Sequence, residues 1–173
     1  MWVADLSRNN RIAKEHGGAG KVHHYLDSLV MSTVDASLAA QNAAVAAESL
    51  GLGIVYLGAM RNQAAEIASA VNLPAYSYVT FGMLVGHPDQ NIQTHIRPRP
   101  TQEVVLHYNT YDLDRSVNAL ETYEESLQAF RNKSGMKDKR WVDMAVDNAD
   151  SLTYMAGRQN LRQAVEERGF ELK

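Results

Sequence analysis

Three short apolar runs have the composition of β-strands. They are "MWVADL" at residues 1–6, "GIVYL" at residues 53–57 and "YSYVTFGMLVG" at residues 76–86. The second and third are rich in β-branched and aromatic side chains, which favour strands, and their continuous apolar character is typical of buried strands. We therefore predict three strands, separated by longer segments that have helical patterns.

The segment between the first two runs carries the strongest helical signal. Residues 27–50 are rich in alanine, and after Ser28 only Asp35 and Glu48 are charged. Gly51 follows directly, where helices commonly end in a glycine. A helix that is apolar on nearly every face is typical of a buried position, and one of over 20 residues spans about 30 Å. We predict a long buried helix at the centre of the domain or of a dimer interface.

The other segments have weaker patterns. The polar stretch "SRNNRIAKEHGGAGKVHH" predicts a loop with at most one helical turn, and "RNQAAEIASAVNL" predicts a short helix that stops before Pro74. Later, "EVVLHY" indicates a short strand or turn, and residues 141–148 and 160–168 indicate helices. Residues 112–131 predict an amphipathic helix with one apolar face, formed by Leu113, Val117, Leu120, Tyr123, Leu127 and Phe130. This order of elements indicates a layered α/β or α+β domain.

Composition and charge narrow the possible classes of function. The 173 residues are 45% hydrophobic, which predicts a single domain over residues 1–173. The net charge of -3 argues against general nucleic-acid binding, and polar residues interrupt the longest apolar stretch, so no membrane span is expected. The absence of cysteine excludes disulfides and thiolate chemistry and is compatible with a reducing cytoplasm. The six histidines lack partners at metal-ligand spacing, so no metal site is predicted.

The first candidate site is "RPRP", residues 97–100. Pro98 and Pro100 fix their own φ angles and hold Arg97 and Arg99 in extended geometry, in which residues two apart point to the same side. Two guanidinium groups preset in this way match phosphate oxygens in bidentate fashion. The alternative is a solvated loop whose arginines pair with acidic neighbours.

The second candidate site is "GLGIVYLGAMRN", residues 51–62. A predicted buried strand runs into Gly58 and Ala59, and a predicted helix starts near Asn62. Small residues at a strand end let a flat ligand approach the backbone, and the helix start that follows favours anions. The spacing is not that of a dinucleotide-binding glycine motif, and a tight turn with no ligand is the alternative.

Taken in order, "AAQNAAVAAESLGLGIVYLGAMRN", "FGMLVGHPDQ" and "RPRP" resemble the oxygen-insensitive NAD(P)H nitroreductase / flavin reductase family, and the resemblance covers nearly the whole chain. It implies an α+β fold, a three-layer sandwich whose mixed sheet is flanked by helices around a long buried central helix. It also implies a cytoplasmic homodimer that uses FMN, with NADPH or NADH as co-substrate, to reduce nitroaromatics, quinones or free flavin. Because the flavin carries the electrons, no catalytic side chain is expected.

The resemblance also implies roles for individual residues. Tyr56, Leu57, Gly58 and Ala59 would line the isoalloxazine ring, and Arg97 and Arg99 would grip the FMN phosphate. Ala59 stands where many members of the family have a second glycine. A basic loop, which in members of this family engages the 2′-phosphate of NADPH, corresponds here to Arg131, Lys133, Lys137, Lys139 and Arg140. For any one of these side chains, a solvated linker is the alternative.

One departure from the family pattern limits the functional prediction. Members of the family begin with an arginine-rich segment of the form R-S-x-R, followed by a serine-bearing segment, and neither precedes "MWVADL" here. The chain therefore resembles the C-terminal two-thirds of such a reductase. One alternative is a non-catalytic remnant that keeps the scaffold and dimer surface but binds FMN poorly or needs a partner chain. Another is a module that binds phosphate-bearing ligands in general.

Overall fold

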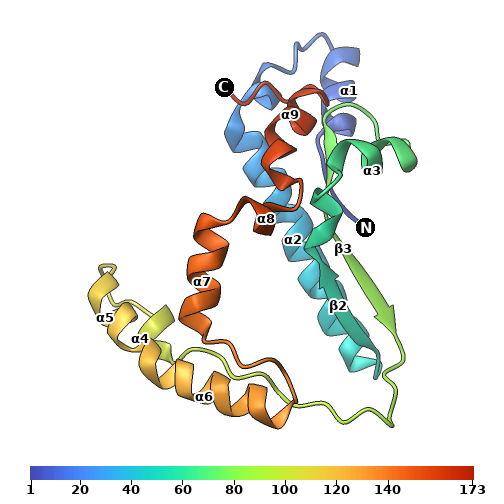
Figure 1. The fold of residues 1–173 in the computed structure, drawn as a ribbon. Coiled ribbons are helices and arrows are strands. Elements are labelled where there is room, and N and C mark those ends of the chain that lie inside the picture. The colour runs from blue at the N-terminus through green and yellow to red at the C-terminus, as the bar shows by residue number, and fades with distance from the viewer. The chain divides into compact units, whose positions relative to one another are not determined.

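The computed structural model describes residues 1–173 and divides into two compact units. Unit 1 comprises Met1–Pro88 and Met155–Lys173, and unit 2 comprises Asp89–Tyr154 (Figure 1). A single domain over residues 1–173 remains a prediction. Over residues 1–173, none of the helices combines the length and apolar character that crossing a lipid bilayer requires.

The sheet of unit 1 is built around its longest strand. The strands are β1 (Trp2–Asp5), β2 (Gly53–Leu57) and β3 (Ser77–Gly86), in the order β1-β3-β2. The first half of β3 pairs with β1 and the second half with β2, both antiparallel. The α+β class is confirmed, but the sheet is antiparallel where a mixed sheet was predicted. A connection long enough for a parallel crossover can equally return the chain antiparallel, so the order of elements did not fix strand direction.

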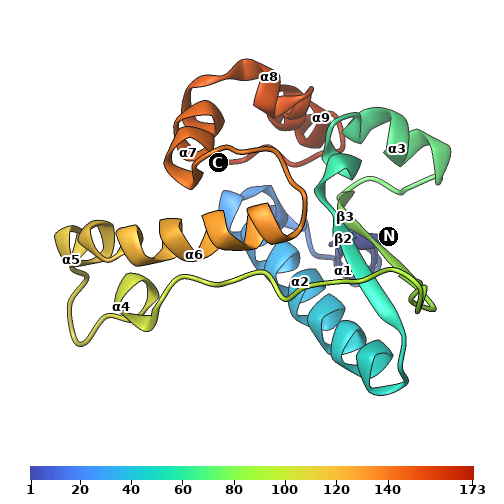
Figure 2. The same ribbon diagram turned by 60° about the horizontal axis from the view of Figure 1, so that its bottom comes forward.

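The long helix α2 (Leu26–Ser49) packs along this sheet, as both ribbon views show (Figures 1 and 2). Its buried positions recur every four residues and are all small: Ser28, Ser32, Ala36, Ala40 and Ala44, followed by Ala47. Small side chains let the helix approach the strands closely, and the Thr33 and Tyr78 hydroxyls lie 2.9 Å apart in a hydrogen bond. The helix ends before Gly51, whose φ is +75°, as the glycine predicted.

The opposite face of α2 is exposed within this chain, so burial of the helix on nearly all sides, at the centre of the domain or of a dimer interface, remains a prediction. Val30, Met31, Val34, Leu38 and Val45 are each about half exposed or more, with Leu38 reaching 62%. The sequence shows that these positions are apolar, but it does not show that the same chain covers them. Within this chain, α2 is therefore buried on one face only.

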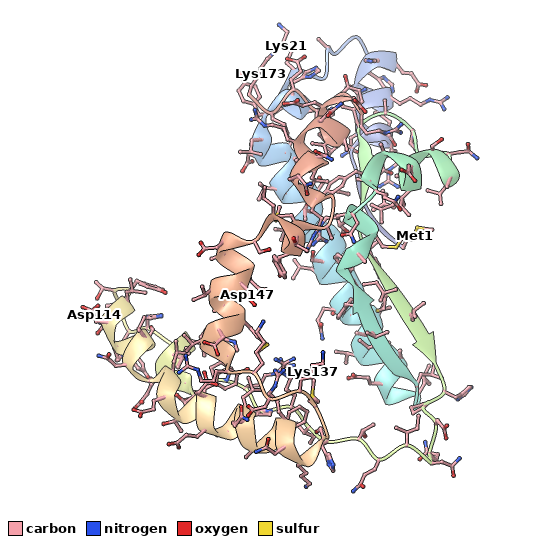
Figure 3. All side chains as sticks on the ribbon, in the orientation of Figure 1. Met1, Lys21, Asp114, Lys137, Asp147 and Lys173 are labelled. Carbon is pink, nitrogen blue, oxygen red and sulfur yellow. The ribbon has the colours of Figure 1, made fainter.

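The last residues of the chain close the core of unit 1. Val165 of α9 (Leu161–Glu166) and Phe170 pack with Ala4, Leu6 and Tyr78 in one buried cluster. Beyond them, the Lys173 N–H donates to the His24 carbonyl at 3.0 Å, beside the 3₁₀ turn η1 (Lys21–His24). Figure 3 shows Lys21 and Lys173 at the same end of this unit.

One further element of unit 1 was predicted wrongly. Residues 7–24 were expected to form a loop with no more than one helical turn, but Ser7–Glu15 form the nine-residue helix α1. The Asp5 carboxylate accepts from the Ser7 N–H at 2.8 Å and holds the first turn, and Arg11 pairs with Glu15 one turn later at 2.8 Å. These local polar contacts stabilise a helix that hydrophobic periodicity does not indicate. The short helix α3 (Ala64–Ala70) ends before Pro74, as predicted.

Unit 2 is helical. It contains α4 (Gln102–Val105), where a strand or turn was expected, α5 (Leu113–Asn118), α6 (Leu120–Lys133) and α7 (Trp141–Asp150). The turn η3 (Arg158–Asn160) belongs to unit 1, and α8 (Leu152–Met155) lies at the boundary. The helix predicted over residues 112–131 is two helices that meet at Ala119.

The predicted apolar face of that helix is correspondingly only half right. Tyr123 and Leu127 of α6 are buried, at 6% and 1% exposure, whereas Leu113 and Val117 of α5 are 59% and 54% exposed. Asp112 caps α5 by accepting from the Arg115 N–H at 2.9 Å, so α5 begins as a helix of its own. The apolar period continues across the break, and for that reason the pattern alone indicated one helix.

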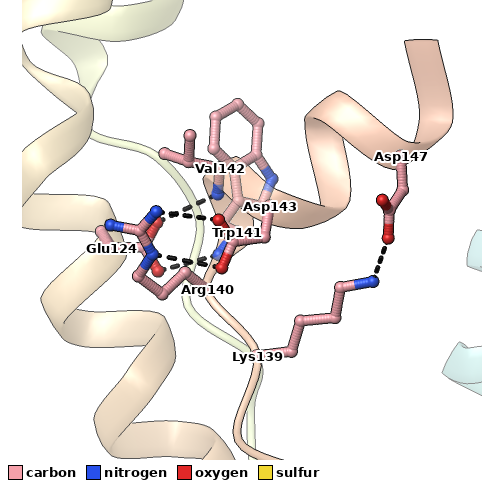
Figure 4. Close-up of polar contacts among 7 residues, drawn as sticks. All are labelled: Glu124, Lys139, Arg140, Trp141, Val142, Asp143 and Asp147. Atoms are coloured by element: carbon pink, nitrogen blue, oxygen red, sulfur yellow. Dashed lines mark hydrogen bonds and ion pairs between the residues drawn. The ribbon is translucent and has the colours of Figure 1, made fainter. Parts of the chain in front are cut away.

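A carboxylate of α6 fixes the start of α7. Glu124 accepts the backbone N–H groups of Trp141 at 2.8 Å and Val142 at 3.1 Å (Figure 4). The Tyr123 and Trp141 rings meet edge-on with their centroids 5.8 Å apart. These contacts satisfy N–H groups that have no partner within the helix, and they join α6 to α7.

The Glu124→Ala substitution is expected to lower the free energy of unfolding by about 1 kcal/mol, the usual cost of losing a helix cap. Urea titration followed by circular dichroism would measure the loss. Glu125→Ala is the matched control, because it makes the same replacement one residue along α6 at an exposed carboxylate without a hydrogen bond. An equal loss in the two variants would contradict the capping role.

Candidate functional site

The predicted residues of the second candidate site, residues 51–62, form one corner of unit 1, where β2 ends at Leu57 and the 3₁₀ turn η2 (Gly58–Arg61) begins. Tyr56 is 40% exposed, its hydroxyl donates to Gln41 Oε1 of α2 at 3.2 Å, and its ring meets Phe81 edge-on at 5.5 Å. Leu57 and Gly58 are half-buried and Ala59 is exposed. The corner thus presents a fixed aromatic ring followed by small residues at an accessible strand end.

The turn after β2 packs tightly against β3. Leu57 pairs in register with Gly82, and a Cβ atom on Gly82 would lie 3.4 Å from Leu57 Cβ and 3.2 Å from Met60 Cγ. The Arg61 guanidinium donates to the Thr80 carbonyl of β3, and the Asn62 N–H donates to the Ala59 carbonyl at 2.9 Å. Glycine at position 82 is therefore what allows this close approach.

A second close contact lies directly after the turn η2, between Asn62 and Gly157. Gly157 has a φ of +98°, and a Cβ atom there would lie only 2.3 Å from the Asn62 carbonyl oxygen. Between η2 and the segment that carries Gly157 lies a cavity of about 300 Å³, which Arg61, Asn62 and Asn160 help to line. Gly157 and Arg61 were not predicted from the sequence to hold this corner. Their partners are distant in the chain, and the only local signal was a glycine after a short helical run.

The first candidate site, residues 97–100, lies in unit 2. Residues 93–100, the arginine segment, have no regular secondary structure, and exposure alternates over the last four of them, residues 97–100. Arg97 and Arg99 are exposed, whereas Pro98 and Pro100 are half-buried. This alternation agrees with the extended geometry that the prolines predicted.

Neither arginine has a partner in the chain. Over residues 1–173, Arg97 and Arg99 form no hydrogen bond and no ion pair. The alternative in which they pair with acidic neighbours is therefore not supported. The two candidate regions belong to different units, and their common role at one cofactor remains a prediction.

Most basic side chains of the loop form contacts within unit 2. Arg131 is buried to 7% exposure, and its Nε donates to the Lys137 carbonyl at 3.1 Å while Nη1 contacts Met144 Sδ at 3.3 Å. The Lys139 ammonium pairs with Asp147 in the same unit (Figure 4). These two side chains therefore stabilise unit 2 and are not available as freely solvated cations.

Arg140 is also held, at the start of α7. Its guanidinium donates to both Asp143 oxygens, at 2.8 and 3.2 Å (Figure 4). This hydrogen-bonded contact lowers the pKa of Asp143 and raises the pKa of Arg140. Of the five basic side chains, only Lys133 and Lys137 have no partner over residues 1–173.

Comparison with known proteins covers both units. Residues 21–87 match the sequence model of the nitroreductase family, and residues 97–173 match that of the nitroreductase family, C-terminal domain. The chain is 31% identical over 175 residues to FMN reductase (NADPH) of Bacillus subtilis, covering 98% of this chain and 68% of that protein.

Comparison with solved structures also finds nitroreductases and flavin oxidoreductases. The structure of a B. subtilis nitroreductase matches with a TM-score of 0.85 at 31% identity, over 98% of this chain and 68% of that one. The NADPH:FMN oxidoreductase of Vibrio harveyi, complexed with NAD⁺, matches with a TM-score of 0.81 at 28% identity, over 99% and 66%. The chain thus spans about two thirds of the length of the proteins that it matches.

The Gly157→Ala substitution should disturb the corner through the Asn62 contact. Gly51→Ala is the control, because Gly51 also has a positive φ but no atom within 4 Å of its added Cβ. We expect the control to lose about 1–2 kcal/mol of stability through left-handed backbone strain. Gly157→Ala should lose a further 1–3 kcal/mol through overpacking. Equal losses in urea denaturation would argue against the close contact.

Proposed function

Because the chain belongs to the nitroreductase family, we propose that it is an FMN-dependent NAD(P)H oxidoreductase, which passes a hydride from NADPH or NADH through the flavin to nitroaromatics, quinones or free flavin. The relatives support this proposal, since one is named FMN reductase (NADPH) and another an NADPH:FMN oxidoreductase complexed with NAD⁺. Bound FMN would supply the redox chemistry, and the residues of this chain bind and orient it.

The corner of unit 1 fits a flat ring. Gly58 has no side chain, Ala59 is small and exposed, and the Tyr56 ring is held by Gln41 and Phe81. An isoalloxazine can therefore approach the backbone of Gly58 and Ala59 closely, beside the Arg61 guanidinium. In this proposal Tyr56, Leu57, Gly58 and Ala59 orient the ring, and no side chain of the chain is assigned a proton-transfer role.

The observation that carries the proposal is the pair of unpartnered arginines. Arg97 and Arg99 are exposed, alternate with two prolines, and form no hydrogen bond or ion pair over residues 1–173. A phosphate supplies the charge and the acceptor oxygens that two guanidinium groups require. Since the prolines already restrict the backbone, little conformational entropy remains to be lost on binding.

The exposed face of α2 supports a homodimer. Val30, Val34, Leu38 and Val45 form an apolar surface on a 24-residue helix, and Val55 of β2 is also 49% exposed. Exposed apolar surface of this extent is typical of protein interfaces. We propose that two copies of the chain pair through this face, in the cytoplasm, and that the remaining partners are small electron acceptors.

A second candidate is a scaffold that keeps the dimer surface but binds FMN poorly or only with a partner chain. A titration of the purified protein with FMN, followed by flavin fluorescence, separates the two. Saturable binding together with NADPH oxidation in the presence of a quinone supports the enzyme, and no binding supports the remnant.

Replacing both Arg97 and Arg99 by alanine should raise the Kd for FMN about a hundredfold. This figure takes the lower value of about 1.5 kcal/mol for each charge-assisted hydrogen bond, because both side chains are exposed. The control is Arg11→Ala with Arg162→Ala, which removes the same charge from two exposed arginines that pair within their own helices. An unchanged FMN titration in the Arg97/Arg99 variant would refute the phosphate clamp.

The Leu38→Glu substitution should convert a dimer into monomers, because it places an unpaired carboxylate in the centre of the α2 face. Size-exclusion chromatography with light scattering gives the mass directly. Ala70→Glu, on the exposed end of α3, is the control and should leave the mass unchanged. A wild-type monomer, or a variant that remains dimeric, would contradict this interface.

A further inference from the structure

We propose that unit 2 has a second ligand site, a pocket between the arginine segment and α6 that binds a planar aromatic carboxylate. The pocket has a volume of about 500 Å³ and lies entirely within unit 2. The arginine segment contributes Thr94, His95 and Pro98, and α6 contributes Ser126, Phe130 and Lys133. This site is distinct from the proposed FMN contacts and does not depend on them.

The charge of the pocket selects an anion. Its lining contains one ammonium group, one imidazole and two hydroxyls, but no carboxylate. Lys133 and His95 form no hydrogen bond or ion pair over residues 1–173, so their N–H groups remain available. The Ser126 hydroxyl already donates to the Thr122 carbonyl at 2.9 Å, which leaves its oxygen only as an acceptor. Lys133, His95 and the Thr94 hydroxyl are therefore the donors to the anion.

The apolar part of the pocket lining favours a flat apolar group in the ligand. Pro98 and Phe130 line the pocket from its two sides, one on the segment and one on the helix. Apolar lining with a few polar groups that fix orientation is the usual composition of small-molecule sites, and this volume lies within their range. A ring system with one carboxylate satisfies both parts of the lining.

The site and the arginine pair use opposite sides of the same segment. Pro98 faces the pocket, whereas Arg97 and Arg99 are exposed and do not line it. A ligand in the pocket would hold the segment against α6 without occupying the guanidinium groups. Binding there would thus order the segment that carries the proposed clamp, while FMN could still bind.

The test uses 2-naphthoate as the probe and its neutral methyl ester as the matched control, with binding measured by isothermal titration and saturation-transfer NMR on the full chain with FMN added. Naphthoate should bind saturably, and Lys133→Ala should raise its Kd about tenfold, as expected for loss of one charge-assisted contact at a partly exposed site. The ester should bind more weakly and respond little to Lys133→Ala. Lys137→Ala is the variant control, since Lys137 also lacks a partner but does not line the pocket.

Each outcome decides the proposal. Equal affinities for the acid and the ester, or equal effects of the Lys133 and Lys137 substitutions, would overturn it. Adenosine 2′-monophosphate is a second probe, and if it binds through Lys133 while naphthoate does not, the site takes a nucleotide and the assignment to aromatic carboxylates is wrong. Flavin absorbance recorded in the same samples shows separately whether FMN binds, so failure of the proposed function would not be mistaken for failure of this one.

Discussion

The ten-residue strand β3 is the constraint on which the rest of unit 1 depends. Its first half pairs with β1 and its second half with β2, so one strand sets the register of both neighbours. Its residue Gly82 admits the turn after β2, its Thr80 carbonyl accepts from Arg61, and Tyr78 bonds to α2. Because side chains alternate along a strand, a slip of one residue in β3 would move all these contacts to the wrong face.

The sequence predicted those elements well whose position depends on residues adjacent in the chain. The apolar runs marked all three strands, Gly51 marked the end of α2, and Pro74 limited α3. The nine-residue α1 was missed because polar contacts stabilise it and it has no apolar stripe. Strand direction and the exposure of Leu38 or Leu113 could not be predicted, since both depend on segments that are distant in the sequence.

At the candidate site too, features that depend on adjacent residues were predicted, and features that depend on distant residues were not. The alternation at Arg97 and Arg99 followed from proline geometry, which acts on adjacent residues, and the structure agrees with it. The contact of Gly157 with Asn62 joins two distant parts of the chain, and no pattern in either part indicates it. Arg131 and Lys133 were both predicted to belong to one basic loop, and nothing in the sequence distinguishes their roles. In the structure, Arg131 is buried against Met144 and stabilises unit 2. Lys133 has no such contact and lines a pocket, where it can bind a ligand.

The division of unit 1 into two stretches of sequence has a consequence for its synthesis. Val165 and Phe170 complete the cluster around Tyr78, yet unit 2 is translated before them. On the ribosome, β1, β3 and α2 must therefore wait with their apolar surfaces uncovered while residues 89–154 emerge, which takes several seconds at about 5–20 residues per second.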